Sequence, residues 1–320
     1  MKPAKHILVT GGAGFIGSHL AERLLNDGKR VVVIDDFSTG SRENLRTFAK
    51  NPGLRVIRSR ISKCRQLPDL VAQSEFIFHL AATVGVELVV KSARHVLEAS
   101  FDETQVVLRA AAKHRTPLLL TSSSEVYGKS AKPEFSEDDD LLIGPPSHSR
   151  WSYACSKLTD EFLALAYNRE QNVPVIIARL FNTVGPRQTG RYGMVLPRFI
   201  AAAQKNEPLR VFGDGAQTRC FCLVHDVVES LVRLQLCGKA RGEIFNIGST
   251  EEVSILELAK LVVRTLGSKS KIERIPYDKA YAPGFDDMRR RKPKVKKLQD
   301  FVGFKPRTTL RDIIRITADK

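Results

Sequence analysis

The fold of this chain is decided by the stretch HILVTGGAGFIG, which occupies residues 6–17. An apolar run comes first, and glycines follow at positions 11, 14 and 17. Glycine at these three places permits a tight turn, a close approach of the backbone to a pyrophosphate, and close packing of the next helix. The N-terminus of that helix, expected near Ser18, offers free N–H groups and a positive dipole end to an anion. We therefore predict a strand, a phosphate-binding turn and a helix.

The same alternation of strand and helix continues to residue 180. The runs predicted to be strands are 6–10, 30–34, 54–58, 75–80, 117–121 and 175–179. They are rich in Val, Ile, Leu and Phe and mostly continuous, which is typical of parallel strands buried on both faces. Helical crossovers between such strands are right-handed and give a doubly wound sheet. We predict an α/β fold with a Rossmann domain over residues 1–180.

The alternation weakens in the second part of the chain. Helices are expected near 192–205, 225–237, 253–266 and 308–316, and short strands near 209–212 and 243–247. This pattern predicts a smaller α/β substrate-binding lobe over residues 181–320, with some segments returning to the Rossmann sheet. The crevice at the carboxyl ends of the strands is then the expected ligand site.

Composition narrows the classes of function. The chain has 320 residues, 42% of them hydrophobic, and a net charge of +16. No apolar run reaches the roughly 20 residues that cross a bilayer, so we expect a cytoplasmic protein without a membrane partner. The five cysteines lack zinc-finger spacing, and no metal is expected. One pyrophosphate needs only a few cations, so most of the basic excess is interpreted as a solvated face. The basic run 289–292 lacks interleaved aromatics, so no specific nucleic-acid partner is expected.

Asp35 directly follows the second predicted strand. A carboxylate at that place binds the adenosine ribose and repels a 2′-phosphate, so NAD is favoured over NADP. The glycine spacing and this acidic turn resemble the extended short-chain dehydrogenase/reductase family. Arg60 and Ser100 depart from that family, which usually has Asp and Asn at these positions. The resemblance implies NAD contacts by Gly11, Gly14, Phe15, Ile16, Gly17, Asp35, Asp36, Leu80, Ala81, Ala82, Tyr153 and Lys157.

Tyr153 and Lys157 stand four residues apart, on one face of a predicted helix. A neighbouring ammonium favours the phenolate, so we expect Lys157 to lower the pKa of Tyr153. Ser123 lies at the carboxyl end of a predicted strand and matches the serine or threonine that binds the reacting hydroxyl in the family. The resemblance implies that Tyr153 takes a proton from a sugar hydroxyl while Lys157 holds the nicotinamide ribose.

Segments 180–187, 213–219 and 246–248 resemble the nucleotide-sugar-binding segments of the epimerase, dehydratase and decarboxylase branch of that family. The resemblance implies a UDP-sugar substrate and a homodimer formed through helices near 91–114 and 151–170. Arginine suits the diphosphate because its fork binds phosphate oxygens in pairs. The residues expected to contact substrate are Asn182, Arg187, Arg219 and Arg150.

Glu125 separates the reactions within this branch. Simple 4-epimerases usually carry Ser, Thr or Ala there, and dehydratases carry Asp-Glu, whereas Ser124-Glu125 resembles the arrangement of UDP-glucuronate decarboxylases. Oxidation of C4 of glucuronate makes a β-keto acid, which loses CO2 readily. We therefore favour decarboxylation of UDP-glucuronate to UDP-xylose, with Glu125 as a catalytic residue.

An alternative remains open at the level of sequence. Segments 185–188 and 192–198 look more like those of UDP-hexose 4-epimerases. A 4-epimerase acting on UDP-glucose, UDP-glucuronate or UDP-N-acetylglucosamine needs the same oxidation, followed by return of the hydride to the other face of the sugar. A 4,6-dehydratase is disfavoured because residue 124 is Ser rather than Asp.

Overall fold

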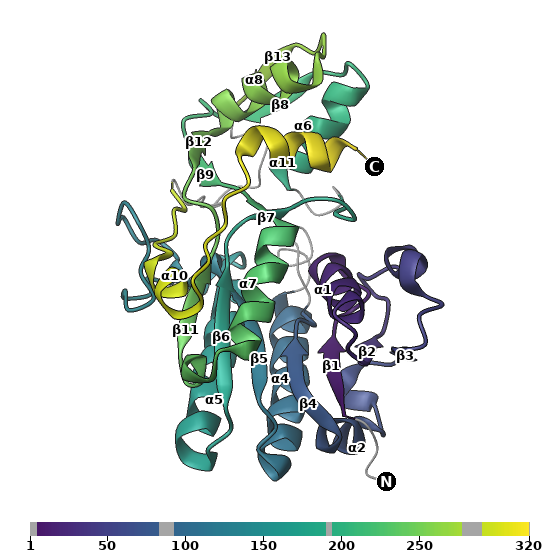
Figure 1. The fold of residues 1–320 in the computed structure, drawn as a ribbon. Helices are drawn as coiled ribbons and strands as arrows, with labels where there is room; N and C mark the ends of the chain where they lie inside the picture. The colour runs from purple at the N-terminus through teal and green to yellow at the C-terminus, as the bar shows by residue number, and fades with distance from the viewer. Residues whose placement is uncertain (1–4, 83–92, 190–193, 277–289, 320) are drawn as a thin grey trace.

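The computed structural model describes residues 5–82, 93–189, 194–276 and 290–319. These residues form a larger body around a central sheet and a smaller lobe beyond the upper ends of its strands (Figure 1). Helices cover both faces of the sheet, which confirms the predicted doubly wound α/β architecture.

The central sheet has seven parallel strands in the order β11-β6-β5-β4-β1-β2-β3. Their bounds are β1 His6–Thr10, β2 Val31–Asp35, β3 Leu54–Arg58, β4 Ser74–His79, β5 Leu118–Ser123, β6 Val175–Leu180 and β11 Ile244–Ile247. The six strands predicted before residue 180 are all present, and the order reverses between β1 and β4. Such a reversal opens a crevice at the carboxyl ends of the strands. The prediction of two buried faces is wrong for β3, whose Arg55 and Val56 are exposed because it is an edge strand.

The helices of this body are α1 Phe15–Asn26, α2 Leu67–Ala72, α4 Ala93–His114, α5 Trp151–Gln171, α7 Val224–Leu236 and α10 Lys296–Val302. Short 3₁₀ turns accompany them at η1 Arg42–Phe48, η2 Ile61–Lys63, η3 Ser124–Tyr127 and η5 Gly238–Ala240. Helix α1 begins before the predicted start near Ser18, since Gly14 already occupies its N-cap.

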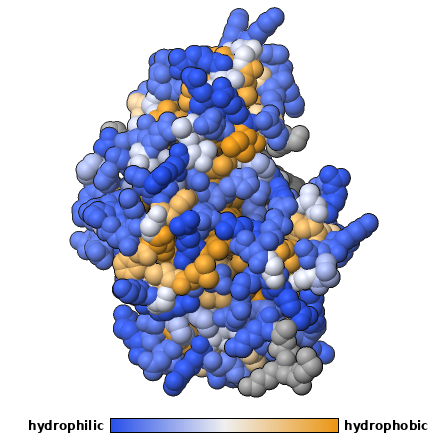
Figure 2. Space-filling view, in the orientation of Figure 1, coloured by the Kyte–Doolittle hydropathy of each residue, from blue (hydrophilic) through white to orange (hydrophobic). Residues whose placement is uncertain are grey.

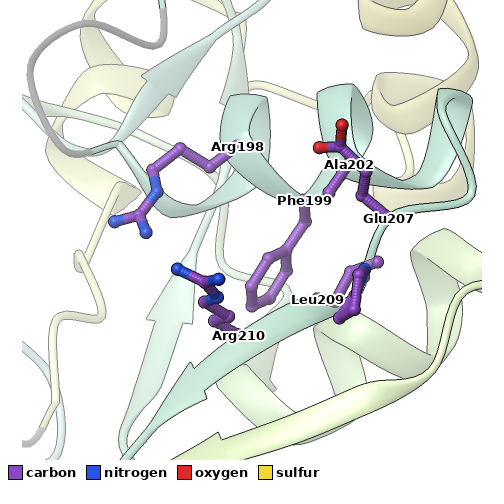
Figure 3. Close-up of a pocket in the computed structure, with 7 residues that line it drawn as sticks. Arg198, Phe199, Ala202, Glu207, Leu209 and Arg210 are labelled. Atoms are coloured by element: carbon purple, nitrogen blue, oxygen red, sulfur yellow. The ribbon is translucent and has the colours of Figure 1, made fainter.

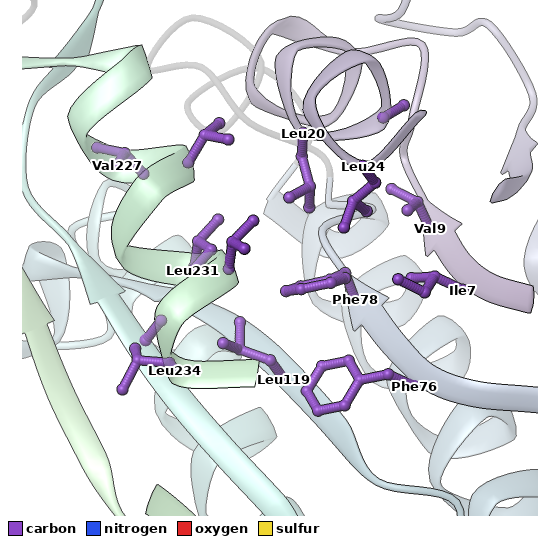
Figure 4. Packing of buried hydrophobic residues seen from close by; sticks show 14 of the residues in the cluster. Ile7, Val9, Leu20, Leu24, Phe76, Phe78, Leu119, Val227, Leu231 and Leu234 are labelled. Atoms are coloured by element: carbon purple, nitrogen blue, oxygen red, sulfur yellow. The ribbon is translucent and has the colours of Figure 1, made fainter. Parts of the chain in front are cut away.

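Strand alternation divides the core between the two faces of the sheet. Ile7 and Val9 of β1 join one cluster, whereas Leu8 between them joins the other, as the two-residue period of a strand requires. On the first face, Leu20 of α1 approaches Leu231 of α7 above the sheet (Figure 4). Helices α2, α4 and α5 cover the second face. Burial of both faces explains the continuous apolar runs in the sequence.

The smaller lobe is built from α6 Val195–Gln204, α8 Ile255–Leu266 and α11 Leu310–Ala318 around a third apolar cluster. Its short strands pair as β8 Leu209–Phe212 with β13 Ile272–Ile275, β9 Thr218–Cys220 with β12 Glu252–Ser254, and β7 Thr183–Val184 with β10 Cys222–Leu223. The predicted strand near 243–247 is β11, which pairs with β6 in the central sheet. Segments of the second half therefore return to the Rossmann sheet.

The surface in this view is mostly hydrophilic, and an apolar area crosses its middle in the region of α7 (Figure 2). Among the described residues, no helix combines the length and apolarity that a membrane crossing requires.

Candidate functional site

The glycine turn between β1 and α1 is packed so closely against backbone that Gly11 and Gly17 have no room for a side chain. Gly11 has a φ of +70°, and a Cβ there would lie 2.8 Å from the backbone nitrogen of Ala81. A Cβ at Gly17 would lie 2.1 Å from the carbonyl oxygen of Gly11. Gly14 caps α1 without any side-chain bond to the first turn, where Phe15 and Ile16 begin the helix. The cradle at this helix N-terminus suits a pyrophosphate.

Asp35 ends β2 directly beside this turn. Its two carboxylate oxygens accept hydrogen bonds from the backbone N–H groups of Ala13 and Phe37, each at 2.8 Å. Burial raises the pKa of Asp35, while these hydrogen bonds act in the opposite direction. The carboxylate is thus fixed at the end of β2, where the sequence predicts a ribose contact.

Asp36 points to a different partner. Arg60, which departs from the family pattern, lies with its Nε 3.6 Å from Asp36 Oδ2. Burial raises the pKa of Asp36, but hydrogen bonds from Ser38 and the charge of Arg60 outweigh burial, so the net pKa is lowered. Asp36 is therefore ionised and paired at the rim of the predicted adenosine site.

Leu80, Ala81 and Ala82 follow β4 and run beside the glycine turn. The backbone nitrogen of Leu80 donates to the carbonyl of Thr10 at 3.2 Å, and that of Ala81 donates to Thr10 Oγ1 at 3.3 Å. The residues predicted to contact NAD before position 100 thus gather at the carboxyl ends of β1, β2 and β4.

A second group of predicted residues meets where β5 ends. Ser123 is the last residue of β5 and the N-cap of η3, and its Oγ accepts a hydrogen bond from the backbone of Glu125 at 3.3 Å. The hydroxyl of Tyr153, from the first turn of α5, forms a hydrogen bond with Ser123. Lys157 follows one turn later on the buried face of the same helix. The structure brings the four predicted catalytic residues together.

The electrostatics at Tyr153 differ from the expectation. Burial raises its pKa, the charges of Glu125 and Asp160 raise it further, and the hydrogen bond with Ser123 acts against them. The expected lowering by Lys157 is therefore not found in this structure. The main physical cause is burial of the phenol, and the Lys157 ammonium is itself paired with Asp160 at 3.4 Å.

Glu125 is held between two arginines. Arg150 Nη2 lies 2.8 Å from one of its carboxylate oxygens, and Arg291 Nη1 lies 2.5 Å from the other. Burial raises the pKa of Glu125, but the charges of Arg291 and Arg150 outweigh burial, so the net pKa is lowered. The result is an ionised carboxylate beside Tyr153, with two guanidinium groups gathered around it.

Sequence reasoning missed Arg291, which it placed on a solvated basic face. That interpretation is wrong for residue 291, whose side chain is only 12% exposed. Its neighbours are paired as well, Arg290 with Glu252 at 2.8 Å and Lys292 with Glu134 at 2.6 Å. The one available signal was the density of basic residues before a proline, because the partners are distant in sequence. Arg289 lies outside the described residues.

The segment 290–294, here called the strap, is anchored by backbone contacts. Phe135 donates from its N–H to the carbonyl of Lys292 at 2.8 Å, and its own carbonyl accepts from the N–H of Lys294 at 2.9 Å. Phe135 is fully buried, against Tyr127. The strap thereby carries Arg291 from the C-terminal part of the chain to Glu125.

The remaining predicted substrate residues lie in three settings. Asn182 donates from Nδ2 to the carbonyl of Cys220 at 3.0 Å, which joins the end of β6 to β9. Arg219 lies on β9, is 8% exposed, and donates to the carbonyl of Thr218 at 2.7 Å. Arg187 contacts Glu22 of α1 at 2.5 Å, so its side chain lies with α1 rather than with the Tyr153 group. Their predicted substrate contacts stay predictions.

A pocket of about 340 Å³ lies in the smaller lobe between α6 and β8. Arg198 and Arg210 project toward the same space from its two sides, and Phe199 lies between the helix and the strand (Figure 3). The lining residues include none of the Tyr153 group, so the two features are separate. Across the described ranges, no three His, Cys, Asp or Glu side chains gather as metal ligands.

The doubly wound sheet, the glycine cradle and the Ser123–Tyr153–Lys157 group define a dinucleotide-dependent enzyme of the Rossmann class. Residues 7–248 match the NAD dependent epimerase/dehydratase family, and the chain belongs to that family. NAD is its cofactor, and the glycine cradle and Asp35 fit this group.

Similar proteins include decarboxylases and an epimerase. The chain is 44% identical over 303 residues to a UDP-N-acetyl-alpha-D-glucosaminuronate decarboxylase of Bacillus cytotoxicus, covering 94% of this chain and 93% of the relative. It is 37% identical over 315 residues to UDP-glucuronic acid decarboxylase 4 of Arabidopsis thaliana, covering 95% of this chain and 66% of that one. A crystal structure of UDP-glucuronic acid 4-epimerase from Bacillus cereus, with UDP-glucuronic acid and NAD, superposes with a TM-score of 0.87 at 29% identity over 98% of both chains.

Proposed function

We propose that this protein is an NAD-dependent decarboxylase of a UDP-linked hexuronate. The observation that carries the proposal is the placement of Glu125 between Arg150 and Arg291, beside the hydroxyl of Tyr153. One carboxylate and two guanidinium groups leave the cluster with a net charge of about +1, which attracts an anionic sugar. A neutral hexose has no group that needs this charge.

Gly11, Gly14 and Gly17 would hold the pyrophosphate of NAD, and Asp35 would hold its adenosine ribose. When bound, NAD supplies reversible oxidation at C4 of the sugar, which places a ketone β to the carboxylate. Tyr153 and Ser123 hold the proton of the C4 hydroxyl through their shared hydrogen bond. Lys157, one turn along α5, fixes the geometry around that phenol.

The arginines act on the charge that the reaction moves. Loss of CO2 shifts negative charge from the sugar carboxylate toward an enolate, and guanidinium groups fixed nearby stabilise both forms without reorganising. Glu125 holds Arg150 and Arg291 in place through its two oxygens. Because it is ionised, Glu125 can also accept a proton and pass it on.

The two candidate substrates differ in the substituent that the sugar carries at C2. The Bacillus cytotoxicus relative acts on an N-acetylated hexuronate and the Arabidopsis relative on glucuronic acid. Both substrates carry the C4 hydroxyl and the carboxylate that the site addresses. UDP-glucuronate, giving UDP-xylose, and UDP-N-acetylglucosaminuronate are therefore the two substrates to compare. A 4-epimerase is the second candidate, favoured by the superposition with the Bacillus cereus enzyme.

The test is incubation of the purified protein and NAD with each UDP-hexuronate, with UDP-glucose and UDP-N-acetylglucosamine as neutral controls. Products are read by mass spectrometry and proton NMR. The proposal predicts a UDP-pentose or its N-acetylamino analogue from the acidic substrates and no change in the neutral ones. An isobaric C4 epimer as the main product would establish the epimerase instead.

We further propose that Arg219, Asn182, Arg187 and Arg150 contact the substrate, the first two on its diphosphate side. The proposal for Arg219 is supported by its place on β9, where its side chain is buried on the strand that Asn182 contacts. Arg219→Ala is expected to raise the KM for the UDP-sugar about tenfold or more, since a charge-assisted phosphate contact is lost. An unchanged KM would remove Arg219 from the substrate site.

We also propose a homodimer formed through α4 and α5. Leu97 and Phe101 on α4 are 40% and 39% exposed, and Phe162 on α5 is 64% exposed. Exposed aromatic and aliphatic side chains on two packed helices suit a second copy of the same face. Light scattering after gel filtration tests this, with Phe162→Glu expected to give monomers. A monomeric wild-type protein would refute the proposal.

A cytoplasmic location is inferred from the five cysteines, all of which are free. Fractionation of the source cells tests this inference.

A further inference from the structure

Helix α5 buries two adjacent carboxylates, Asp160 at 0% and Glu161 at 2% exposure. Glu161 is neutralised by Arg179 of strand β6, which donates to both carboxylate oxygens at 2.8 and 3.0 Å. Asp160 has a different kind of partner, the Lys157 ammonium on its own helix. The two carboxylates therefore serve different ends, and only Asp160 is joined to the catalytic group.

The contacts of Asp160 converge on one oxygen. Its Oδ2 accepts from Lys157 Nζ at 3.4 Å and from the Ser100 hydroxyl on α4 at 2.8 Å. Its Oδ1 is buried without a hydrogen-bond donor in the described part of the chain. A fully buried carboxylate is costly unless it is paired, so this residue type is not explained by packing.

His79 of β4 faces the same space and contributes no charge. Its ring nitrogens lie 2.8 Å from Thr10 Oγ1 and 3.2 Å from Thr104 Oγ1. Burial and the charge of Lys157 lower its pKa to about 3, so the ring is neutral near pH 7. His79 therefore adds no second positive charge beside Lys157, and Asp160 is the carboxylate paired with the Lys157 ammonium.

Charged groups from several elements surround Tyr153. Glu125 approaches from η3 and is paired with Arg150, at the start of α5, and with Arg291 of the strap. Lys157 and Asp160 lie further along α5. Lys157 lies between the phenol four residues before it and the carboxylate three residues after it. The negative charge of Asp160, which lies beside this ammonium, raises the pKa of Tyr153.

We propose that Asp160 is a positioning residue. It holds the Lys157 ammonium through the ion pair between them and limits the attraction of that ammonium for the phenolate of Tyr153. Ser100, where the family usually has Asn, anchors this carboxylate from α4. The inference deepens the proposed function, on which its kinetic test rests, but it concerns the protonation of Tyr153 and can be tested without any substrate.

The direct test is a titration of Tyr153 by tyrosinate absorbance, taken as the difference between each protein and its Tyr153→Phe counterpart. Asp160→Asn removes the charge and keeps the shape, so the midpoint should move to lower pH by roughly one unit. Glu170→Gln is the matched control, because it removes one charge from the exposed end of the same helix. Its midpoint should stay at the wild-type value.

Kinetics provide the second readout. The acid limb of the kcat profile should move to lower pH in Asp160→Asn, with KM for the UDP-hexuronate within about twofold of wild type, since Asp160 does not reach the crevice. Ser100→Ala removes the hydrogen bond to Asp160 but keeps the Asp160 charge, so it should lower kcat without moving the acid limb of the profile. This variant serves as the test if Asp160→Asn does not fold.

A titration midpoint that stays unchanged or moves to higher pH in Asp160→Asn would overturn the proposal. For Ser100→Ala, a shifted limb or an unchanged kcat would do the same. Failure of every UDP-hexuronate to react would instead refute the proposed function and leave the titration result standing.

Discussion

Gly17 and Glu125 show the two constraints that act on single residues in this site. At Gly17 the constraint is space, because the backbone of Gly11 occupies the place of a side chain. At Glu125 the constraint is charge, because two arginines approach a carboxylate that is only 18% exposed. The first constraint is local and visible in the spacing of glycines. The second depends on partners up to the C-terminal part of the chain.

Gly17→Ala is expected to abolish NAD binding. The added Cβ would meet the Gly11 carbonyl at 2.1 Å, which no rotation relieves because both atoms belong to the backbone frame. We expect NAD affinity to fall at least about 100-fold, as a steric cost of several kcal/mol implies. Isothermal titration measures this. Gly238→Ala is the control, since a Cβ there meets nothing within 4 Å. Normal NAD affinity in Gly17→Ala would refute the assignment of the glycine turn as the pyrophosphate site.

Glu125→Gln is expected to lower kcat by about 10²-fold or more, because a neutral amide cannot hold both arginines by charge. The matched control is Glu134→Gln, whose partner Lys292 lies next to Arg291 on the strap but whose side chain is 43% exposed. An exposed pair contributes little, so activity should remain within about twofold of wild type. Equal losses in the two variants would show that Glu125 serves only to fold the strap.

At the scale of elements, the sequence predicted what local periodicity and spacing encode. The strands β1 to β6, the helix that carries Tyr153 and Lys157, and α6, α7, α8 and α11 were all predictable. Strand β8 was predictable as well, whereas the strap, the other short strands of the smaller lobe and helix α10 were not, because very short strands and isolated ion pairs leave little periodic pattern. The pairing of Lys157 with Asp160 was missed although both lie on one helix, since i,i+3 charges are usually solvated.

Packing of α7 against α1 over the sheet makes a testable contribution to stability. Leu231 is fully buried in that interface (Figure 4). Leu231→Ala should lower the free energy of unfolding by about 2–5 kcal/mol through lost burial and a residual cavity. Leu236→Ala on the same helix is 73% exposed in the wild type and should cost less than about 0.5 kcal/mol. Urea unfolding of both variants checks this, and similar losses would contradict the assigned packing.

At the scale of the whole molecule, the site is assembled from segments that are far apart in the chain. The glycine turn comes from the N-terminal part, Tyr153 from the middle, and Arg291 from the C-terminal part, across the body that Figure 1 shows. His19 of α1 adds another long-range tie, since its Nε2 lies 2.9 Å from the carbonyl of Pro186. Cofactor and substrate segments are thereby coupled through the global fold.

Burial of His19 predicts an acid-dependent loss of stability. Burial lowers the pKa of His19 from 6.5 to about 4, so between these values the unfolded chain binds a proton that the folded protein does not. The stability contribution is present above about pH 6.5 and is lost as the pH falls toward 4. His19→Gln can keep the hydrogen bond and should weaken this dependence, measured as urea midpoints at pH values across that window. An identical pH dependence in the two proteins would contradict the assignment.

The central claim is that the enzyme removes CO2 from a UDP-hexuronate. The most direct measurement follows UDP-hexuronate labelled with carbon-13 at its carboxyl carbon by NMR, with enzyme and catalytic amounts of NAD. We predict that labelled CO2 and bicarbonate appear in step with a UDP-linked product lacking the carboxylate, without net formation of NADH. Retention of the label in an inverted C4 epimer would contradict the account and identify a 4-epimerase.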